Sequence, residues 1–140
     1  MRLVIGNKAY SSWSMRPWVV MKAFSIPFEE TLIQLRSGDT YDRIVKVSPS
    51  GKVPALIDGD VLVWETLAIF EYLADTFPQH AIWPRDAKAR AHARAIAAEM
   101  HAGFQPLRQA CPMDVTKRFA ARDCGPDVAA NIARITAIFR

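Results

Sequence analysis

The chain has 140 residues, of which 51% are hydrophobic and 23% charged, and its formal net charge is +4. This is the composition of a soluble globular protein, and no apolar run approaches the ~20 residues of a membrane-spanning helix. The sequence shows no signal peptide, and its basic residues between Arg85 and Arg94 lack the interleaved aromatics of a nucleic-acid-binding module. We expect a cytoplasmic protein that binds neither membranes nor nucleic acids.

The first half of the chain alternates predicted strands and helices. These are a strand at 2–5, a helix from Trp13 or Ser14 to Phe24, a strand at 28–35, a short helix ending before Pro49, strands at 53–58 and 61–65, and a helix at 66–77. The Asp58-Gly59-Asp60 turn joins the last two strands as a hairpin. The order βαβαββα, with one right-handed parallel crossover and an antiparallel edge, predicts an α/β thioredoxin-like fold. In the helix at 66–77, the predicted apolar face comprises Leu67, Phe70, Leu73, Ala74 and Phe77.

The second half is predicted to be helical. We expect a thioredoxin-like domain at 1–78, a proline-containing linker at 79–86 and an incomplete all-helical domain at 87–140. A long Ala-rich helix is predicted from Ala87 to about Gln109, and a last helix within 126–140. The last helix has an apolar stripe that must be buried, formed by Val128, Ile132, Ile135 and Ile138 or Phe139. We expect this region to pack on the first domain and on another chain, or the sequence to be part of a longer one.

Cysteine and histidine spacings give no sign of a metal site. Cys111 and Cys124 form neither a C-x-x-C motif nor a zinc-binding spacing, and we interpret them as packing or surface thiols. The three histidines, His80, His92 and His101, match no metal-binding motif. We predict no metal.

Three serines stand where the first helix begins, in the stretch "YSSWSMRPW". The N-terminus of a helix has unpaired N–H groups and a partial positive charge, so it attracts an anion. A cysteine there would be a redox nucleophile, but this chain has Ser11, Ser12 and Ser14. A serine hydroxyl at this position can instead donate a hydrogen bond to the thiolate of another molecule.

The sequence resembles the cytosolic glutathione transferases, and among them the zeta-like and related bacterial serine-type members. The motifs that carry the resemblance are "SSWSMRPW", "SGKVPAL", "WETLAIFEYLAD" and, in the second region, "AAEMHAGFQPLR". They stand in the family's order and spacing and cover essentially the whole chain. The resemblance implies that glutathione is the co-substrate, that the protein is a homodimer, and that it conjugates small electrophiles or isomerises them as maleylacetoacetate isomerase does.

The resemblance also implies roles for the serines. Ser11 is expected to activate the thiol of glutathione, with Ser12 as the second candidate. Ser12 and Trp13 are expected to add hydroxyl or backbone contacts, although zeta-like enzymes often have cysteine at the position of Trp13. Ser14 is expected to be the N-cap of the helix. The alternative is that Ser11 and Ser12 form only a helix-entry turn.

Further residues are expected to hold the tripeptide. Val53-Pro54 suits a cis peptide bond, which would turn the backbone of Val53 outward to pair with glutathione like an added strand. Glu65 would attract the γ-glutamyl ammonium and Thr66 would hold the γ-glutamyl carboxylate. Lys52 is either a partner of the glycyl carboxylate or a solvated lysine. By resemblance, Gln105 and Arg108 come from a helix that approaches the ligand or the partner subunit.

Two other functions are alternatives to a transferase. The chain could be a non-catalytic, truncated transferase-like module that binds glutathione or another protein, as its unpartnered last helix suggests. A glutaredoxin-like reductase is disfavoured because no cysteine lies in the turn before the first helix.

Overall fold

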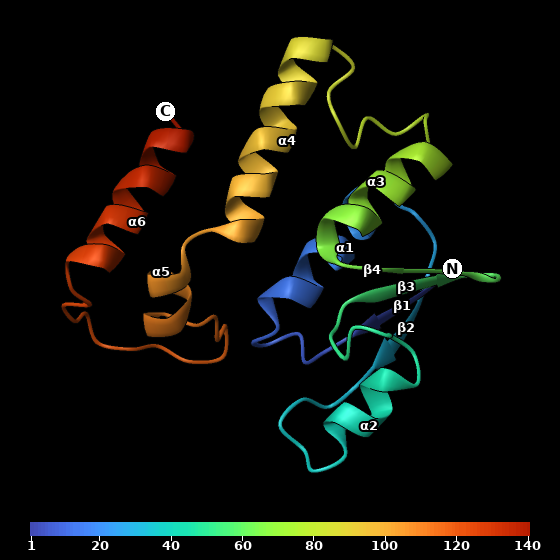
Figure 1. The fold of residues 1–140 in the computed structure, drawn as a ribbon, viewed down its shortest axis with the longest axis horizontal. Coiled ribbons are helices and arrows are strands. Elements are labelled where there is room, and N and C mark those ends of the chain that lie inside the picture. Colours follow the sequence, from blue (N-terminus) through green and yellow to red (C-terminus); the bar gives the residue numbers. More distant parts are fainter.

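A mixed four-stranded sheet organises the first half of the computed structural model, which describes residues 1–140 (Figure 1). Its strand order is β2-β1-β3-β4, with β1 parallel to β2 and antiparallel to β3, and with β3 and β4 forming the predicted hairpin. The strands are β1 (Arg2–Ile5), β2 (Glu29–Leu32), β3 (Ala55–Asp58) and β4 (Val61–Trp64). The second strand is thus shorter than the predicted 28–35.

Helices cover both faces of this sheet. They are α1 (Ser12–Ala23), α2 (Thr40–Val45) and α3 (Thr66–Thr76). Because side chains alternate along a strand, Leu3 and Ile5 of β1 pack in one cluster and Val4 packs in another. The first cluster includes Met21 of α1 and Leu73 of α3, and the second includes residue 44 of α2. The thioredoxin-like arrangement predicted from the sequence is confirmed.

The remaining helices lie beside the α1–α3 side of the sheet (Figure 1). They are α4 (Ala87–Ala102), α5 (Gln105–Ala110) and α6 (Pro126–Ile138). Arg94 of α4 binds Glu71 of α3, with Nε 3.0 Å from Oε1. Arg134 of α6 binds Glu99 of α4, with Nε 2.6 Å from Oε1. These ion pairs connect the sheet-covering helix α3 to α4, and α4 to α6.

The predicted long helix from Ala87 to Gln109 is wrong, because the chain turns after Ala102. Gly103 closes α4 by donating its N–H to Glu99 O at 2.8 Å. Phe104 then adopts a left-handed conformation with φ 65°, and its side chain is buried. Pro106 has no N–H to donate to a continuing helix, so it suits the first turn of the new helix α5.

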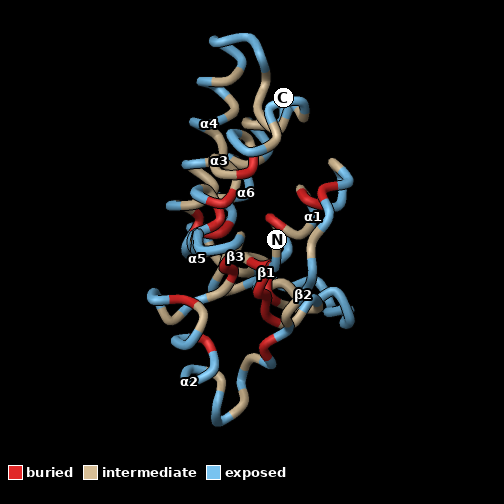
Figure 2. The backbone as a smooth tube through the Cα atoms, turned by 90° about the vertical axis from the view of Figure 1, so that its right-hand side faces the viewer, coloured by how far each residue is buried: buried red, intermediate tan, exposed pale blue.

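Two predicted apolar helix faces are only partly buried within this chain. In α3 the buried residues are Thr66, Ile69 and Leu73, whereas Leu67, Phe70, Ala74 and Phe77 are only half-buried. In α6 Val128 is buried, but Ile132 is 51% and Phe139 83% exposed. Figure 2 shows the buried residues gathered on the sheet and on the inner turns of α1 and α3. None of the helices combines the length and the hydropathy that a membrane-spanning segment requires.

Candidate functional site

A pocket of about 490 Å³ opens between the N-termini of α1 and α3, the start of β3 and the C-terminal turn of α4. Its lining contains most of the site residues predicted from the sequence: Ser11, Trp13, Lys52, Val53, Pro54, Glu65 and Thr66. The rest of the lining is formed by Leu35, Ile44, Ser50, Gly51 and His101. The fold thus brings six separate segments of the chain to one cavity.

Ser11 is the N-cap of α1 and is buried, with 8% of the residue exposed. The hydroxyl does not cap the helix. Instead, Ser11 Oγ donates to Ser14 Oγ at 2.9 Å, and Ser14 Oγ accepts from the N–H of Gly6 at 3.0 Å. The expectation that Ser14 is the N-cap is therefore wrong: Ser14 lies in the first turn and is buried. Ser11 meets the pocket at the positive end of the α1 dipole.

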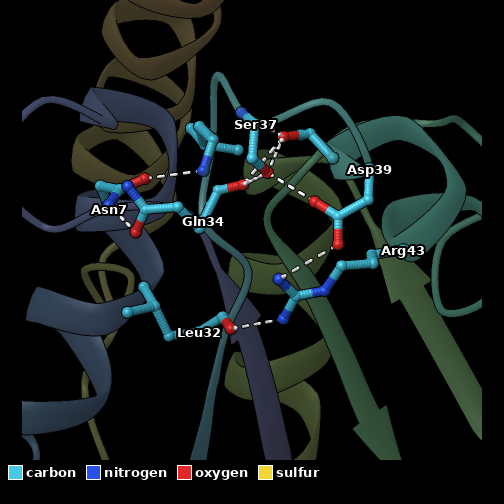
Figure 3. Close-up of polar contacts among 8 residues, drawn as sticks. Asn7, Leu32, Gln34, Ser37, Asp39 and Arg43 are labelled. Atoms are coloured by element: carbon cyan, nitrogen blue, oxygen red, sulfur yellow. Dashed lines mark hydrogen bonds and ion pairs between the residues drawn. The ribbon is translucent and has the colours of Figure 1, made fainter.

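The loop that leads to Ser11 is fixed by a polar network with the segment after β2 (Figure 3). Asn7 Nδ2 donates to Gln34 Oε1 at 2.7 Å, and Asn7 Oδ1 accepts from the N–H of Leu35 at 2.8 Å. At the start of α2, Ser37 Oγ donates to Asp39 Oδ1 at 2.7 Å, which lowers the pKa of the Asp39 carboxyl. Because Leu35 lines the pocket, this network joins two of its walls.

The peptide bond between Val53 and Pro54 is cis, as the sequence indicated. It lies directly before β3, which pairs with β1 and β4 from Ala55 onward. Neither the N–H nor the C=O of Val53 takes part in a hydrogen bond within the chain. Both backbone groups are therefore available, at the pocket wall, to an extended peptide that would pair with them as a strand does.

Glu65 and Thr66 form the opposite wall at the start of α3. Glu65 is the N-cap of α3 and has a φ of 71°, which is uncommon for a residue other than glycine and occurs often at functional sites. Thr66 is 1% exposed, and its Oγ1 donates to Trp13 O at 3.4 Å. This contact ties the N-terminus of α3 to the first turn of α1. The unpaired N–H groups at the start of α3 suit a carboxylate.

His101, at the end of α4, also lines the pocket, and it is not among the site residues predicted from the sequence. Its Nε2 lies 3.5 Å from Glu65 Oε2, and its Nδ1 is buried without a hydrogen-bond partner. The imidazole packs edge-on against Trp13, with the ring centroids 5.0 Å apart. No sequence motif links residues 13, 65 and 101, and only the docking of α4 against α3 brings them together.

Positive charge surrounds Trp13 on its other sides. The guanidinium carbon of Arg16 lies 4.0 Å from the Trp13 ring centroid, and that of Arg108 lies 4.8 Å from it. Burial lowers the pKa of the Arg16 guanidinium, and the nearby charge of Arg108 lowers it further. Arg108 therefore contacts Trp13 from beside the pocket and is not part of the pocket lining.

The other predicted site residues differ in their position relative to this pocket. Lys52 lines it with an exposed side chain that forms no salt bridge within the chain. Ser12 lines an adjacent cavity of about 290 Å³, which shares Trp13 with the first pocket. Gln105 is exposed and is not part of the pocket lining. The chain has no group of three His, Cys, Asp or Glu side chains placed to hold a metal ion.

Comparisons with known proteins agree with this geometry. The sequence model of the family described as glutathione S-transferase, N-terminal domain, matches residues 10–76. A probable maleylacetoacetate isomerase from Caenorhabditis elegans is 37% identical over 97 residues, which are 69% of this chain and 44% of that protein. Glutathione S-transferase Z1 from Arabidopsis thaliana is 33% identical over 104 residues, covering 71% of this chain and 47% of the relative.

A solved structure gives the same result. A glutathione transferase homolog from Burkholderia, with bound glutathione, superposes with a TM-score of 0.67 at 32% identity, over 77% of this chain and 59% of that one. The chain spans about half the length of the curated relatives that it matches. The fold, the matched segment and these similarities together show that the chain belongs to the glutathione S-transferase family, whose N-terminal domain it carries at residues 10–76.

Proposed function

We propose that the pocket binds glutathione and that the protein is a glutathione transferase of the serine type. The observation that carries this proposal is the meeting, in one pocket, of the Ser11 hydroxyl, the unpaired backbone groups of Val53 and the N-terminus of α3. These three features suit the thiol, the extended backbone and one carboxylate of a thiol tripeptide. The bound glutathione in the similar Burkholderia structure supports the choice of ligand.

Ser11 is the proposed activator of the thiol. In the structure the Ser11 hydroxyl donates to Ser14 Oγ, which also accepts from the N–H of Gly6. When the glutathione thiol ionises, the Ser11 hydroxyl would turn from Ser14 to the sulfur, while Ser14 keeps its hydrogen bond with Gly6. The N-terminus of α1 adds its partial positive charge beside the thiolate. Ser12 is the second candidate, and the adjacent cavity that it lines is the alternative place for the sulfur.

The remaining pocket residues are proposed to hold the peptide. The backbone of Val53, next to the cis bond to Pro54, would pair with the cysteinyl unit of glutathione. Glu65 would bind the γ-glutamyl ammonium, and Thr66, at the N-terminus of α3, would bind the γ-glutamyl carboxylate. The unpaired Lys52 would bind the glycyl carboxylate. Trp13 would form one side of the thiol end of the pocket.

The thiolate would then attack a small electrophile, or add reversibly to a maleyl-type dicarboxylate and isomerise it. The second reaction is suggested by the similarity to the probable maleylacetoacetate isomerase. A cytoplasmic homodimer is also proposed, in keeping with the family. In such a dimer the exposed Gln105 would contact the ligand or the partner subunit.

Calorimetric titration with glutathione, together with turnover of chlorodinitrobenzene and maleylacetone, tests the proposal. The wild type should bind glutathione and turn over at least one of the two substrates. Ser11→Ala should still bind but lose most of its turnover, whereas Ser12→Ala should retain it. Binding without turnover in the wild type would support the non-catalytic module, and absence of binding at millimolar glutathione would refute the assignment of the pocket.

A further inference from the structure

The two cysteines of the chain, far apart in sequence, lie side by side at the base of one loop. Cys111 is the C-cap of α5, and Cys124 directly precedes Gly125, the N-cap of α6. Their Sγ atoms are 3.6 Å apart. Their separation in the sequence matches neither a C-x-x-C motif nor a zinc-binding spacing. The packing of α5 against α6 accounts for their proximity.

The surroundings of this pair allow the sulfurs to come together. A disulfide bond is about 2.05 Å long, so the two Sγ atoms need to approach by about 1.5 Å. Residues 111–125 form no helix or strand, and no regular hydrogen bonding has to break. The ends of the loop are already held together, because the side-chain amide oxygen of Asn131 in α6 accepts from the N–H of Leu107 in α5 at 3.3 Å.

Both cysteines line a cavity of about 690 Å³ that is distinct from the glutathione pocket. Its charged side chains are Arg36, Arg122 and Asp114, and the Asp114 carboxylate already pairs with Lys117 at 3.6 Å. Two arginines are therefore left to attract anionic groups. A small disulfide that carries carboxylates fits both the charge of this cavity and the chemistry of its two thiols.

We propose that Cys111 and Cys124 form a redox-active dithiol, which a small anionic disulfide such as glutathione disulfide converts into an intramolecular disulfide. One cysteine thiolate attacks a sulfur of glutathione disulfide, forming a mixed disulfide and releasing one glutathione, which takes up a proton. The second cysteine loses its proton and attacks the protein sulfur of the mixed disulfide, releasing the second glutathione. The two protein thiols lose two electrons, and one glutathione disulfide is reduced to two glutathione molecules.

The new disulfide would restrain a loop that touches the proposed glutathione site. The N–H of Val115, within the loop, donates to Ala9 O at 2.9 Å, two residues before Ser11. Cys111 also lines the adjacent cavity that contains Ser12 and Trp13. The cysteine pair, whose redox state would change, therefore lies next to the loop that carries Ser11 and Ser12. The proposal does not rest on transferase activity, since thiol exchange at this site needs none of the pocket residues.

Peptide mapping after incubation of the native protein with glutathione disulfide tests this inference. Trypsin releases Cys111 in peptide 109–117 and Cys124 in peptide 123–134. We expect these peptides to be linked in the wild type, with the loss of both titratable thiols and their return on reduction. Cys111→Ser and Cys124→Ser should each stop at a mixed disulfide with one glutathionyl group. Ser11→Ala should form the linkage as the wild type does, even if the proposed transferase function fails.

Circular dichroism confirms that each variant is folded, and the urea-unfolded wild type is the control for chance proximity. The unfolded chain should carry mainly separate glutathione adducts, because it lacks the juxtaposition of the two sulfurs. If the native wild type also carries only separate adducts, or forms disulfides only between chains, the inference is overturned.

Discussion

Replacing Ser11 by alanine tests the mechanism most directly, and the structure sets the size of the effect. The Ser11 hydroxyl already has a neutral partner, Ser14 Oγ, at 2.9 Å. Ionisation of the bound thiol exchanges this bond, of about 0.5–1.5 kcal/mol, for a bond to a charged sulfur of about 1.5–3 kcal/mol. The net gain is about 1–1.5 kcal/mol, or about one pKa unit. Ser11→Ala should therefore raise the pKa of the bound glutathione thiol by about one unit, from about 7 to about 8, and lower turnover at pH 7 about fivefold.

The assay is the pH dependence of kcat, which reports ionisations in the enzyme–substrate complex. Ser14→Ala is a matched control with the opposite expected sign, because it frees the Ser11 hydroxyl and should lower the thiol pKa. It also leaves the buried N–H of Gly6 without an acceptor, at a cost of about 1–3 kcal/mol in stability. An unshifted profile for Ser11→Ala, or a shift produced instead by Ser12→Ala, would refute the role given to Ser11.

Other residues give further predictions. Lys52→Gln should raise the Kd of glutathione about twofold to fivefold at low salt, and calorimetry at high salt should remove most of the difference. Glu65→Gln should raise the Kd about tenfold or more, through loss of a charge-assisted hydrogen bond. The Arg134 guanidinium holds the pKa of the Glu99 carboxyl below its ordinary value. The ion pair therefore stabilises the fold at pH values above the ordinary pKa of a carboxyl, and this stabilisation is lost as the pH falls through the lowered pKa of Glu99. Glu99→Gln should accordingly lower the Tm at neutral pH and leave it nearly unchanged in acid, and an equal loss at both would contradict this.

The fold of the first half could be predicted because its local signals agree with one another. The turn at Gly59, the alternation along β1 and the proline before β3 each specify one feature of the same sheet. The prediction of one long helix was wrong for a local reason. Phe104 adopts a left-handed conformation, and helix periodicity in the sequence does not encode it. The buried surface of α3 is wider than the predicted stripe, because the sheet contacts one side of that helix and α4 and Trp83 contact another.

The candidate site was predictable only where its residues stand next to one another in the sequence. Val53 with Pro54, and Glu65 with Thr66, could be identified from their local motifs, and the structure brings them to one pocket. His101 could not be identified, because its place depends on the docking of a helix that follows in the second half of the chain. The Cys111–Cys124 pair was missed for the same reason, since two packed helices create it.

The hydrogen bond between Ser11 and Ser14 also limits how acidic the bound thiol can become. A free thiol has a pKa of about 8.5, and moving it down by two units requires about 2.7 kcal/mol. A hydroxyl without a competing acceptor would contribute about 1.5–3 kcal/mol, which together with the helix N-terminus is sufficient. With Ser14 as the competing acceptor, Ser11 contributes about 1–1.5 kcal/mol and the helix N-terminus about 0.3–1 kcal/mol. The bound thiol is therefore expected to titrate at about pH 7, where half of it is ionised, and not near 6.5.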